Sequence, residues 1–362
     1  MEIHARGVND ALRKVLFMLL EYDEGEDKGE GTSWHRQTSR NGDTLEFDEP
    51  VATYYERPLE RVLFYKERDA NPFLHLFESL WLLAGRDDVR FMEYLVPKFR
   101  NYSDDGHRMQ GSYGYRWRKA FGVDQLDFLV NHLKQKPDSR RAVLQMWRPP
   151  YDLHGVDYGT HVEAGIDSTD IPCNTNAYFK VRDGRLNMTV CNRSNDLIWG
   201  AYGANVVHFS ILQEYMAARL GLEVGTYVQF SDSLHVYTGG EGGKVWERIK
   251  AGWSPSVYQE RSPYALGAVK PQPMFVDPDN SCHRQDQLHY WHQDLETFFL
   301  LFDGGQEVQV SSFTHPWWKF VAAPLWNAWK NRDAGYLEGC IATDWKLAAA
   351  TWLAAHPKKE AK

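Results

Sequence analysis

Cysteine is scarce in this sequence, with four residues among 362, and no two of them form a Cys-x-x-Cys pair. Cysteines spaced so widely argue against a disulfide framework and against a zinc knuckle. We therefore expect no metal site. The four residues are Cys173, Cys191, Cys282 and Cys340.

Long apolar runs are also missing. No stretch is long enough to cross a bilayer, and the first residues lack the hydrophobic region of a signal peptide. Hydrophobic residues still make up 43% of the chain, which suffices for a sizeable core in one large domain or two ordinary ones. We expect a soluble, cytoplasmic protein that does not bind membranes.

An excess of positive charge is the third absence. The 41 Lys and Arg residues are outnumbered by 49 Asp and Glu residues, which gives a net charge of -8. Nonspecific nucleic-acid binding needs a basic face, so nucleic acid is not an expected partner. A small anionic ligand held by a local arginine cluster is compatible with this charge.

The hydrophobic pattern predicts both helices and strands, in an α+β arrangement with a mixed sheet backed by helices. Asp183-Gly184 separates two strand-like runs and is a strong hairpin signal. A loop rich in Gly, Asp and Glu is expected through Arg36 and Arg40. We expect helices over 9–22, 72–85, 205–220 and 288–302, and strands over 142–148, 176–182 and 186–192.

Cys173 is the candidate nucleophile. It follows Pro172 at the expected start of a strand, between the arginine pair Arg140 and Arg141 and the downstream Arg193. A cationic setting favours the thiolate and can hold a phosphate. A lone cysteine is more often inert core, but the arginines favour nucleophilic attack on a phosphorylated substrate.

Glu78 is an outlier on the apolar helix expected over 72–85. A carboxylate buried there costs free energy unless it is paired or protonated. We therefore predict a proton-transfer role, with a purely structural hydrogen bond as the alternative.

Six sequence blocks resemble, in the same order, the signature blocks of the thymidylate synthase superfamily, which includes pyrimidine nucleotide hydroxymethylases. The resemblance covers roughly residues 35–240 and implies a catalytic core over 1–240 with the thymidylate synthase-like mixed sheet. Residues 241–362 would form a divergent, Trp-rich helical extension packed on that core. The blocks are Phe-Glu-Ser-Leu-Trp-Leu-Leu-Ala-Gly at 77–85, Tyr-Gly-Tyr-Arg-Trp-Arg at 113–118, Ser-Arg-Arg at 139–141, Pro-Cys at 172–173, Arg-Ser-Asn-Asp at 193–196 and His-Val-Tyr at 235–237.

The resemblance implies covalent catalysis on a pyrimidine nucleoside monophosphate. The Cys173 thiolate would add to C6 of the ring, so that C5 becomes nucleophilic enough to attack a one-carbon unit from 5,10-methylenetetrahydrofolate. Glu78, Tyr113 and Asn205 would be the other catalytic residues.

The resemblance also implies how phosphate and sugar are held. Arg193 would act within its own subunit, while Arg140 and Arg141 would reach the phosphate of the neighbouring subunit, so the protein would be a homodimer. Arg40 is the expected N-terminal phosphate ligand, with Arg36 as a close rival. Further contacts to phosphate and sugar hydroxyls would come from Ser194, His235 and Tyr237.

Asn205 bears on the choice of base. An amide can donate to O4 and accept from N3-H of uracil, whereas cytosine is better matched by a carboxylic side chain, and cytosine-specific members of the superfamily have Asp there. The run from Arg193 to Asn205 is one residue longer than in the synthases, so a gapless match would place Ala204 at this position instead.

Several departures from the synthases concern the final step, in which an exocyclic methylene at C5 takes hydride or water. The chain lacks the C-terminal Gly-Tyr-x-Pro-His-Pro segment that helps exclude water. Asn174 replaces His after the nucleophile and Phe99 replaces a folate-site Trp, whereas Asp196 matches the pterin-contacting aspartate. We predict a deoxyuridylate 5-hydroxymethylase. The alternatives are a thymidylate synthase, then a dCMP or CMP hydroxymethylase, and, in another class, a non-catalytic nucleotide-binding protein.

Overall fold

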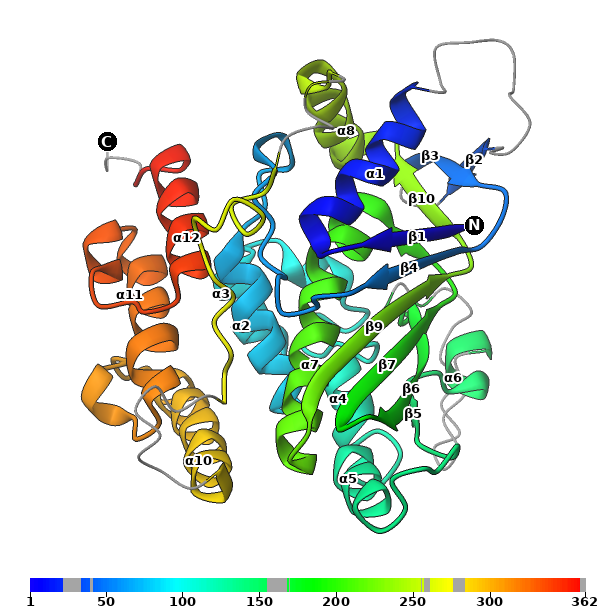
Figure 1. Ribbon diagram of the computed structural model, residues 1–362. Helices are drawn as coiled ribbons and strands as arrows, with labels where there is room; N and C mark the ends of the chain where they lie inside the picture. The colour runs from blue at the N-terminus through cyan, green and yellow to red at the C-terminus, as the bar shows by residue number, and fades with distance from the viewer. Residues whose placement is uncertain are drawn as a thin grey trace.

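The computed structural model describes residues 1–21, 34–39, 42–154, 168, 170–254, 256, 261–275 and 284–358. A twisted sheet lies on one side, helices pack against one of its faces, and a second group of helices lies beyond these (Figure 1). The structure contains mixed β-sheet together with many α-helices, which confirms the predicted α+β class.

The larger sheet is mixed, in the order β1-β4-β9-β7-β6-β5. The pairs β1/β4 and β7/β9 are parallel and the others antiparallel. Its strands are β1 (Glu2–Ala5), β4 (Val51–Tyr55), β5 (Val143–Gln145), β6 (Asn174–Arg182), β7 (Arg185–Asn192) and β9 (Glu223–Ser231).

The hairpin between β6 and β7 forms as predicted. Asp183 and Gly184 have φ values of 48° and 73°, the left-handed conformation that a two-residue type I′ turn requires at both positions. The turn fixes the register from Arg182 opposite Arg185 to Asn176 opposite Cys191, and a one-residue irregularity then places Asn174 opposite Asn192.

The smaller sheet has the order β2-β3-β10-β8. Arg36 lies in its edge strand, so the expectation of a loop there is wrong. The strand is mostly exposed and is held by backbone pairing with β3 rather than by burial, so its sequence carries no hydrophobic alternation. Arg40 lies outside the described residues. The strands are β2 (Trp34–Ser39), β3 (Gly42–Phe47), β8 (Asn195–Asp196) and β10 (Leu234–Tyr237).

Helices α1 (Val8–Glu21) and α7 (Asn205–Leu220) contact the buried face of the larger sheet. The predicted helix over 205–220 is thus confirmed, and it ends at Gly221, which has the left-handed conformation typical of a helix C-terminus. The other α-helices are α2 (Pro72–Leu83), α3 (Val89–Leu95), α4 (Tyr113–Arg118), α5 (Gln125–Gln135), α6 (Pro149–His154), α8 (Gly240–Gly252), α10 (Arg284–Asp303), α11 (Ala323–Asn331) and α12 (Thr343–Ala355).

Helix α2 begins where Pro72 predicts. The Asn71 side chain accepts hydrogen bonds from the backbone N–H groups of Phe73 and Leu74, at 3.0 and 3.1 Å, which satisfies donors that the first turn leaves free. The helix packs against α7. It therefore carries Glu78 into the interior next to the helix that begins at Asn205.

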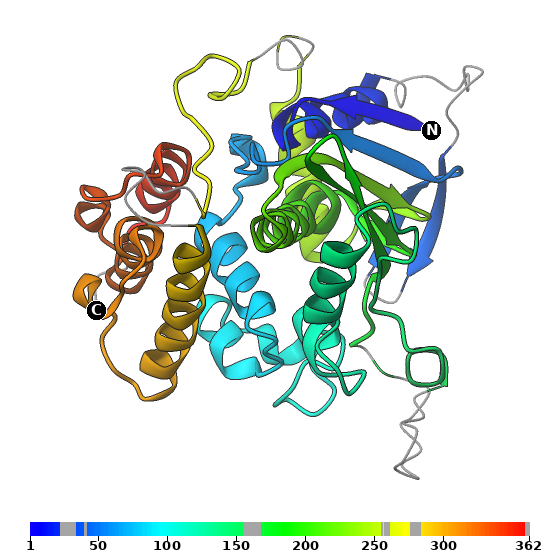
Figure 2. The same cartoon turned by 60° about the horizontal axis from the view of Figure 1, so that its bottom comes forward.

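The tryptophan-rich C-terminal helices pack on α2 from its other side. The rings of Phe77 and Trp326 are 5.0 Å apart, and those of Phe73 and Trp329 are 5.4 Å apart. Figure 2 shows α10 to α12, coloured from gold to red, grouped beside the light-blue helix α2. Buried side chains of both parts belong to one continuous hydrophobic core, while the domain boundary at residue 240 stays a prediction.

None of the helices in the described ranges combines the length and the apolar character that a bilayer crossing requires.

A buried ion pair ties α7 to the segments around it. Arg61 and Glu214 form this pair with side chains that are 2% and 5% exposed, and Glu214 also accepts a hydrogen bond from the backbone N–H of Met274. One carboxylate thus joins α7 to the chain that leads into the C-terminal helices.

We predict that Glu214→Gln lowers the free energy of unfolding by about 3–5 kcal/mol, because a buried arginine would lose its counter-charge. Urea denaturation followed by tryptophan fluorescence measures this change. The matched control is Glu241→Gln, which removes a fully exposed ion pair with Lys244 and should leave the denaturation midpoint unchanged. Equal midpoints for Glu214→Gln and the wild type would contradict the prediction.

Candidate active site

A cleft of about 190 Å³ opens between α2, the start of α4, the start of α7 and the segment 170–172 that precedes β6. Glu78, Tyr113 and Asn205 all line it. Three of the predicted catalytic residues, which are distant in sequence, therefore share one concave site, and Cys173 follows directly after its wall at Pro172.

Cys173 stands directly before β6, as the sequence predicts, and Arg193 holds the backbone around it. The backbone N–H of Arg193 donates to the Cys173 carbonyl at 3.0 Å. Its guanidinium donates to the carbonyls of Pro172 and Ile171 at 3.0 and 3.3 Å, and lies 5.3 Å from the ring centre of Trp147. Arg193 thus places a cation near the thiol and holds the backbone of residues 171–173 through hydrogen bonds.

Burial and the arginine act on the Cys173 thiol in opposite directions. Burial raises the pKa of the Cys173 thiol and outweighs the lowering by the Arg193 guanidinium, while the nearby Asp196 raises that pKa further. A hydrogen bond with Tyr113 lowers it in part. The expected shift toward the thiolate by arginine is present, but it is opposed by the cost of burying the charge.

Tyr113 stays protonated in the site. Burial raises the pKa of its phenol well above the ordinary value, and the neighbouring Cys173 and Glu78 raise it further. A neutral phenol is a hydrogen-bond donor. Tyr113 can therefore donate to the sulfur of Cys173 or to a bound substrate.

Glu78 faces His208 across the contact between α2 and α7. Oε2 of Glu78 lies 3.2 Å from Nε2 of His208, and the two side chains are 19% and 3% exposed. His208 is thus the ionisable neighbour of Glu78 on this otherwise apolar helix. His208 was not among the predicted site residues. Its only signal in the sequence is its position one helical turn after Asn205, which places both side chains on the same face of the helix.

Asn205 is the first residue of α7 and is buried. Its Nδ2 donates to Oδ1 of Asn195 at 3.1 Å, and Asn195 in turn donates to Ser231 at 3.0 Å, which orients the Asn205 amide. Ala204 also lines the cleft.

The extra residue before Asn205 has a structural counterpart. Residues 197–204 form a wide π-type turn with non-helical backbone angles at Tyr202 and Gly203, and such turns accommodate an additional residue. A Cβ at Gly203 would lie 2.6 Å from the carbonyl of Ile198, so this turn requires glycine there.

Asp196 has one satisfied and one unsatisfied carboxylate oxygen. Oδ1 accepts a hydrogen bond from the backbone N–H of Trp199, whereas Oδ2 is buried and has no hydrogen-bond partner among the described residues. Burial raises the pKa of this carboxyl. A buried oxygen of this kind costs free energy until a ligand donates to it. Phe99 and Trp81 add aromatic surface to the cleft.

His235 and Tyr237 lie on strand β10, as predicted, and their rings are 5.3 Å apart on the same side. In the parallel register of β10 and β8, His235 lies opposite Asp196. Ser194 lies in the turn just before β8 and is partly exposed. These polar groups therefore extend the site from Asp196 along the smaller sheet.

Arg140 and Arg141 lie far from Cys173 of the same chain. Both side chains are exposed just before β5, where the Ala142 carbonyl accepts a hydrogen bond from the Phe179 N–H at 3.0 Å. At about 3.3 Å per strand residue, six residues of β6 place them about 20 Å along the sheet from the thiol. The structure does not bring this pair into its own cleft.

Asp170 is a second cleft residue that the sequence analysis missed. Burial raises the pKa of its carboxyl to about 7, while backbone hydrogen bonds from Gly111 and Gln110 lower it in part. Oδ2 is buried without a hydrogen-bond partner among the described residues. No local signal marks it, because a single aspartate in a loop is usually solvated.

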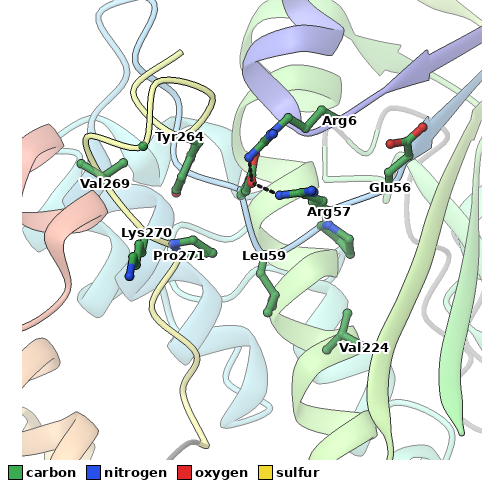
Figure 3. A pocket seen from close by; sticks show the side chains of 12 residues that line it. Arg6, Glu56, Arg57, Leu59, Val224, Tyr264, Val269, Lys270 and Pro271 are labelled. Carbon is green, nitrogen blue, oxygen red and sulfur yellow. Dashed lines mark hydrogen bonds and ion pairs between the residues drawn. The ribbon is translucent and has the colours of Figure 1, made fainter. Parts of the chain in front are cut away.

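A hollow of about 400 Å³ lies elsewhere, between Arg57, Val224 and the segment around Tyr264 (Figure 3). Arg6 and Arg57, which line it, both form ion pairs with the buried Glu60. This hollow holds none of the predicted site residues.

Within the described residues, His, Cys, Asp and Glu side chains form no group of three or more that could hold a metal ion.

Comparisons with known proteins bear on the chemistry. A sequence model described as thymidylate synthase matches residues 67–250. A deoxyuridylate hydroxymethyltransferase of Pseudomonas phage M6 is 42% identical over 365 residues, covering 97% of this chain and 93% of the phage protein. Another, from Bacillus phage SP01, is 38% identical over 224 residues, covering 59% of this chain and 56% of that protein. The solved thermostable thymidylate synthase A from Bacillus subtilis is 21% identical, with 67% of this chain and 84% of that chain covered and a TM-score of 0.49.

The matched region contains Cys173, Glu78, Tyr113 and Asn205, the residues gathered around the cleft. It also includes nearly all of α8, which begins at the predicted domain boundary. The alignment with the M6 protein spans nearly the whole chain and so continues into the Trp-rich region. The chain belongs to the thymidylate synthase family.

Proposed function

We propose that this protein is a deoxyuridylate 5-hydroxymethylase that uses methylenetetrahydrofolate. The observation that carries the proposal is the cleft that joins Glu78, Tyr113 and Asn205 beside the thiol of Cys173. Similarity to the M6 deoxyuridylate hydroxymethyltransferase over nearly the full chain supports the choice of reaction.

Asn205 supports uracil as the base. Its amide nitrogen carries two hydrogens, and one of them is used by Asn195. The second hydrogen can go to O4 of uracil while Oδ1 accepts from N3-H. In the orientation that Asn195 fixes, the amide cannot make both contacts to cytosine, which presents a donor at N4 and an acceptor at N3. The π-type turn that ends at Ala204 supports Asn205, rather than Ala204, as the base-reading residue.

The two predicted folate contacts, Asp196 and Phe99, offer groups that a pterin can use. The buried Oδ2 of Asp196 can accept from the N–H groups of a pterin ring, and Phe99 offers an aromatic wall. The folate supplies a one-carbon unit at the oxidation level of formaldehyde. Its binding would also satisfy the oxygen that the ligand-free site leaves without a partner.

The chain's own residues account for the covalent steps. Cys173 adds to C6 once its proton has left, and Tyr113 can donate a hydrogen bond to the sulfur as charge develops there. Glu78 is placed to move protons around the pyrimidine carbonyl through water. Expulsion of the thiolate at the end restores the aromatic ring.

We also propose a homodimer in which arginines cross the interface. The register of β5 on β6 supports this, because Arg140 and Arg141 cannot reach the Cys173 of their own chain. The sheet face opposite α1 and α7 carries Tyr178 and Phe230, which are 47% and 36% exposed and offer apolar surface to a second subunit. Arg193 would bind the phosphate from within the subunit, with Ser194, His235 and Tyr237 completing the contacts.

We place the enzyme in the cytoplasm.

The reaction products test the proposal directly. We predict that purified protein with methylenetetrahydrofolate converts dUMP to its 5-hydroxymethyl derivative, identified by mass spectrometry, and leaves dCMP and CMP unchanged. Formation of dTMP together with dihydrofolate would instead establish a thymidylate synthase, and binding without tritium release from C5-labelled dUMP would establish a non-catalytic protein.

Cys173→Ser should reduce turnover by roughly four orders of magnitude or more, because the hydroxyl cannot replace the thiolate nucleophile. Binding of dUMP, measured by calorimetry, should persist, since phosphate contacts do not use the sulfur. The control is Cys340→Ser, which alters a buried thiol in the C-terminal region and should keep full turnover. Turnover retained in Cys173→Ser would mean that the nucleophile is another residue.

Mixed dimers test the crossing arginines. An Arg140→Ala/Arg141→Ala double variant and a Cys173→Ser variant should each be inactive alone. After subunit exchange, random pairing should restore about one quarter of wild-type activity, because half the dimers contain one complete site of two. Steady-state rates before and after exchange measure this. No recovery in a mixture shown by native mass spectrometry to contain heterodimers would refute the crossing.

A further inference from the structure

His208 is buried in the active-site wall without satisfied hydrogen bonds. It lies on α7, one turn after Asn205, and lines the cleft with a side chain that is 3% exposed. Neither Nδ1 nor Nε2 makes a hydrogen bond to any residue that the structure describes. Nε2 approaches the carboxylate of Glu78 to 3.2 Å, without the geometry of a hydrogen bond.

A buried imidazole with two unsatisfied nitrogens requires a partner. Burying polar atoms without hydrogen bonds costs free energy, and each such atom in a native protein calls for an explanation. Because His208 lines the cleft, a ligand in the cleft can supply that partner. Glu78 lines the same cleft, so the ligand can contact the carboxylate and the imidazole together.

The charged groups around His208 come from three sides. From α2, Glu78 is its nearest carboxylate, and His75 lies one turn earlier, with a pKa lowered well below the ordinary value by burial and by the cationic Arg68. Tyr113 lines the cleft from α4, and Asp170 lines it from the loop before β6. An imidazole beside one carboxylate is a suitable acceptor for a proton from water, because the carboxylate stabilises the imidazolium that forms.

We propose that His208, paired with Glu78, binds the water that captures the exocyclic methylene at C5 and accepts its proton. This inference rests on the proposed hydroxymethylation and assigns the step that distinguishes it from reductive methylation. His208 would then be a catalytic residue in contact with the reacting water.

The step balances without an oxidant or reductant. The water oxygen bonds to the exocyclic carbon, the π electrons of the C5 methylene move to form the C4 enolate, and the water proton passes to His208. The enolate then re-forms the C4 carbonyl and the C5=C6 bond as the Cys173 thiolate leaves C6. The imidazolium finally returns its proton to the thiolate or to solvent.

The test uses His208→Gln and His208→Ala. It compares the rate of tritium release with the rate of hydroxymethyl-nucleotide formation, and it measures the product that an added thiol traps. Each variant is incubated with C5-tritiated dUMP and methylenetetrahydrofolate, with and without 2-mercaptoethanol, a thiol that can attack the same methylene. Tritium release reports the steps before water capture. Mass spectrometry measures the hydroxymethyl nucleotide, the thioether nucleotide and the methylene adduct on Cys173 of the intact protein.

We expect tritium release close to that of the wild type, hydroxymethyl product reduced about 100-fold, and an increase in both the thioether and the Cys173 adduct. Glutamine can hydrogen-bond to water but cannot accept its proton, so it separates proton transfer from packing, and it remains informative if the alanine variant does not fold. The matched control is His75→Gln, a buried histidine outside the cleft lining, which should keep the wild-type ratio of products.

An unchanged ratio of hydroxymethyl product to tritium release in folded His208→Gln would overturn the inference, as would a parallel fall of both. The same holds if only Asp170→Asn, and not the His208 variants, accumulates the adduct. These results differ from failure of the proposed function, in which the wild-type protein itself would form no hydroxymethyl nucleotide.

Discussion

The antiparallel register of β6 and β7 is the constraint on which the site depends. Asn174 lies opposite Asn192, so the residue before one strand and the residue after the other, Cys173 and Arg193, meet at the same end of the hairpin. There the Arg193 backbone bonds to the Cys173 carbonyl and its guanidinium bonds to the preceding carbonyls. A slip of one residue would turn these side chains to the opposite face and separate the thiol from its cation.

The contact between α2 and α7 supplies the other half of the site. It brings Glu78 against His208 one turn from Asn205, at a place that sequence distance does not reveal. Aromatic side chains of the C-terminal helices pack on Phe73 and Phe77 of α2. The Trp-rich extension therefore stabilises the helix that carries Glu78, which links a region without predicted catalytic residues to the geometry of the cleft.

Burial governs the electrostatics of the site more than the arginines do. It raises the pKa of the Cys173 thiol despite Arg193, keeps Tyr113 protonated and raises the pKa of Asp170 to about 7. The buried Asp196 retains an oxygen without a partner. Asp170 and His208, which line the cleft, likewise have buried polar atoms without a hydrogen-bond partner among the described residues.

The sequence by itself determined the hairpin, because Asp183-Gly184 permits the left-handed turn, and it determined the start of α2 and the end of α7 through Asn71, Pro72 and Gly221. Its ordered motifs also predicted roles for Cys173, Arg193, Glu78 and Asn205. Only the tertiary structure showed that β2 is a strand, that Arg140 and Arg141 lie about 20 Å from the thiol, and that His208 and Asp170 line the cleft. Local turns and caps are fixed by neighbouring residues, whereas edge pairing, burial and contacts between distant helices depend on side chains that no short stretch of sequence contains.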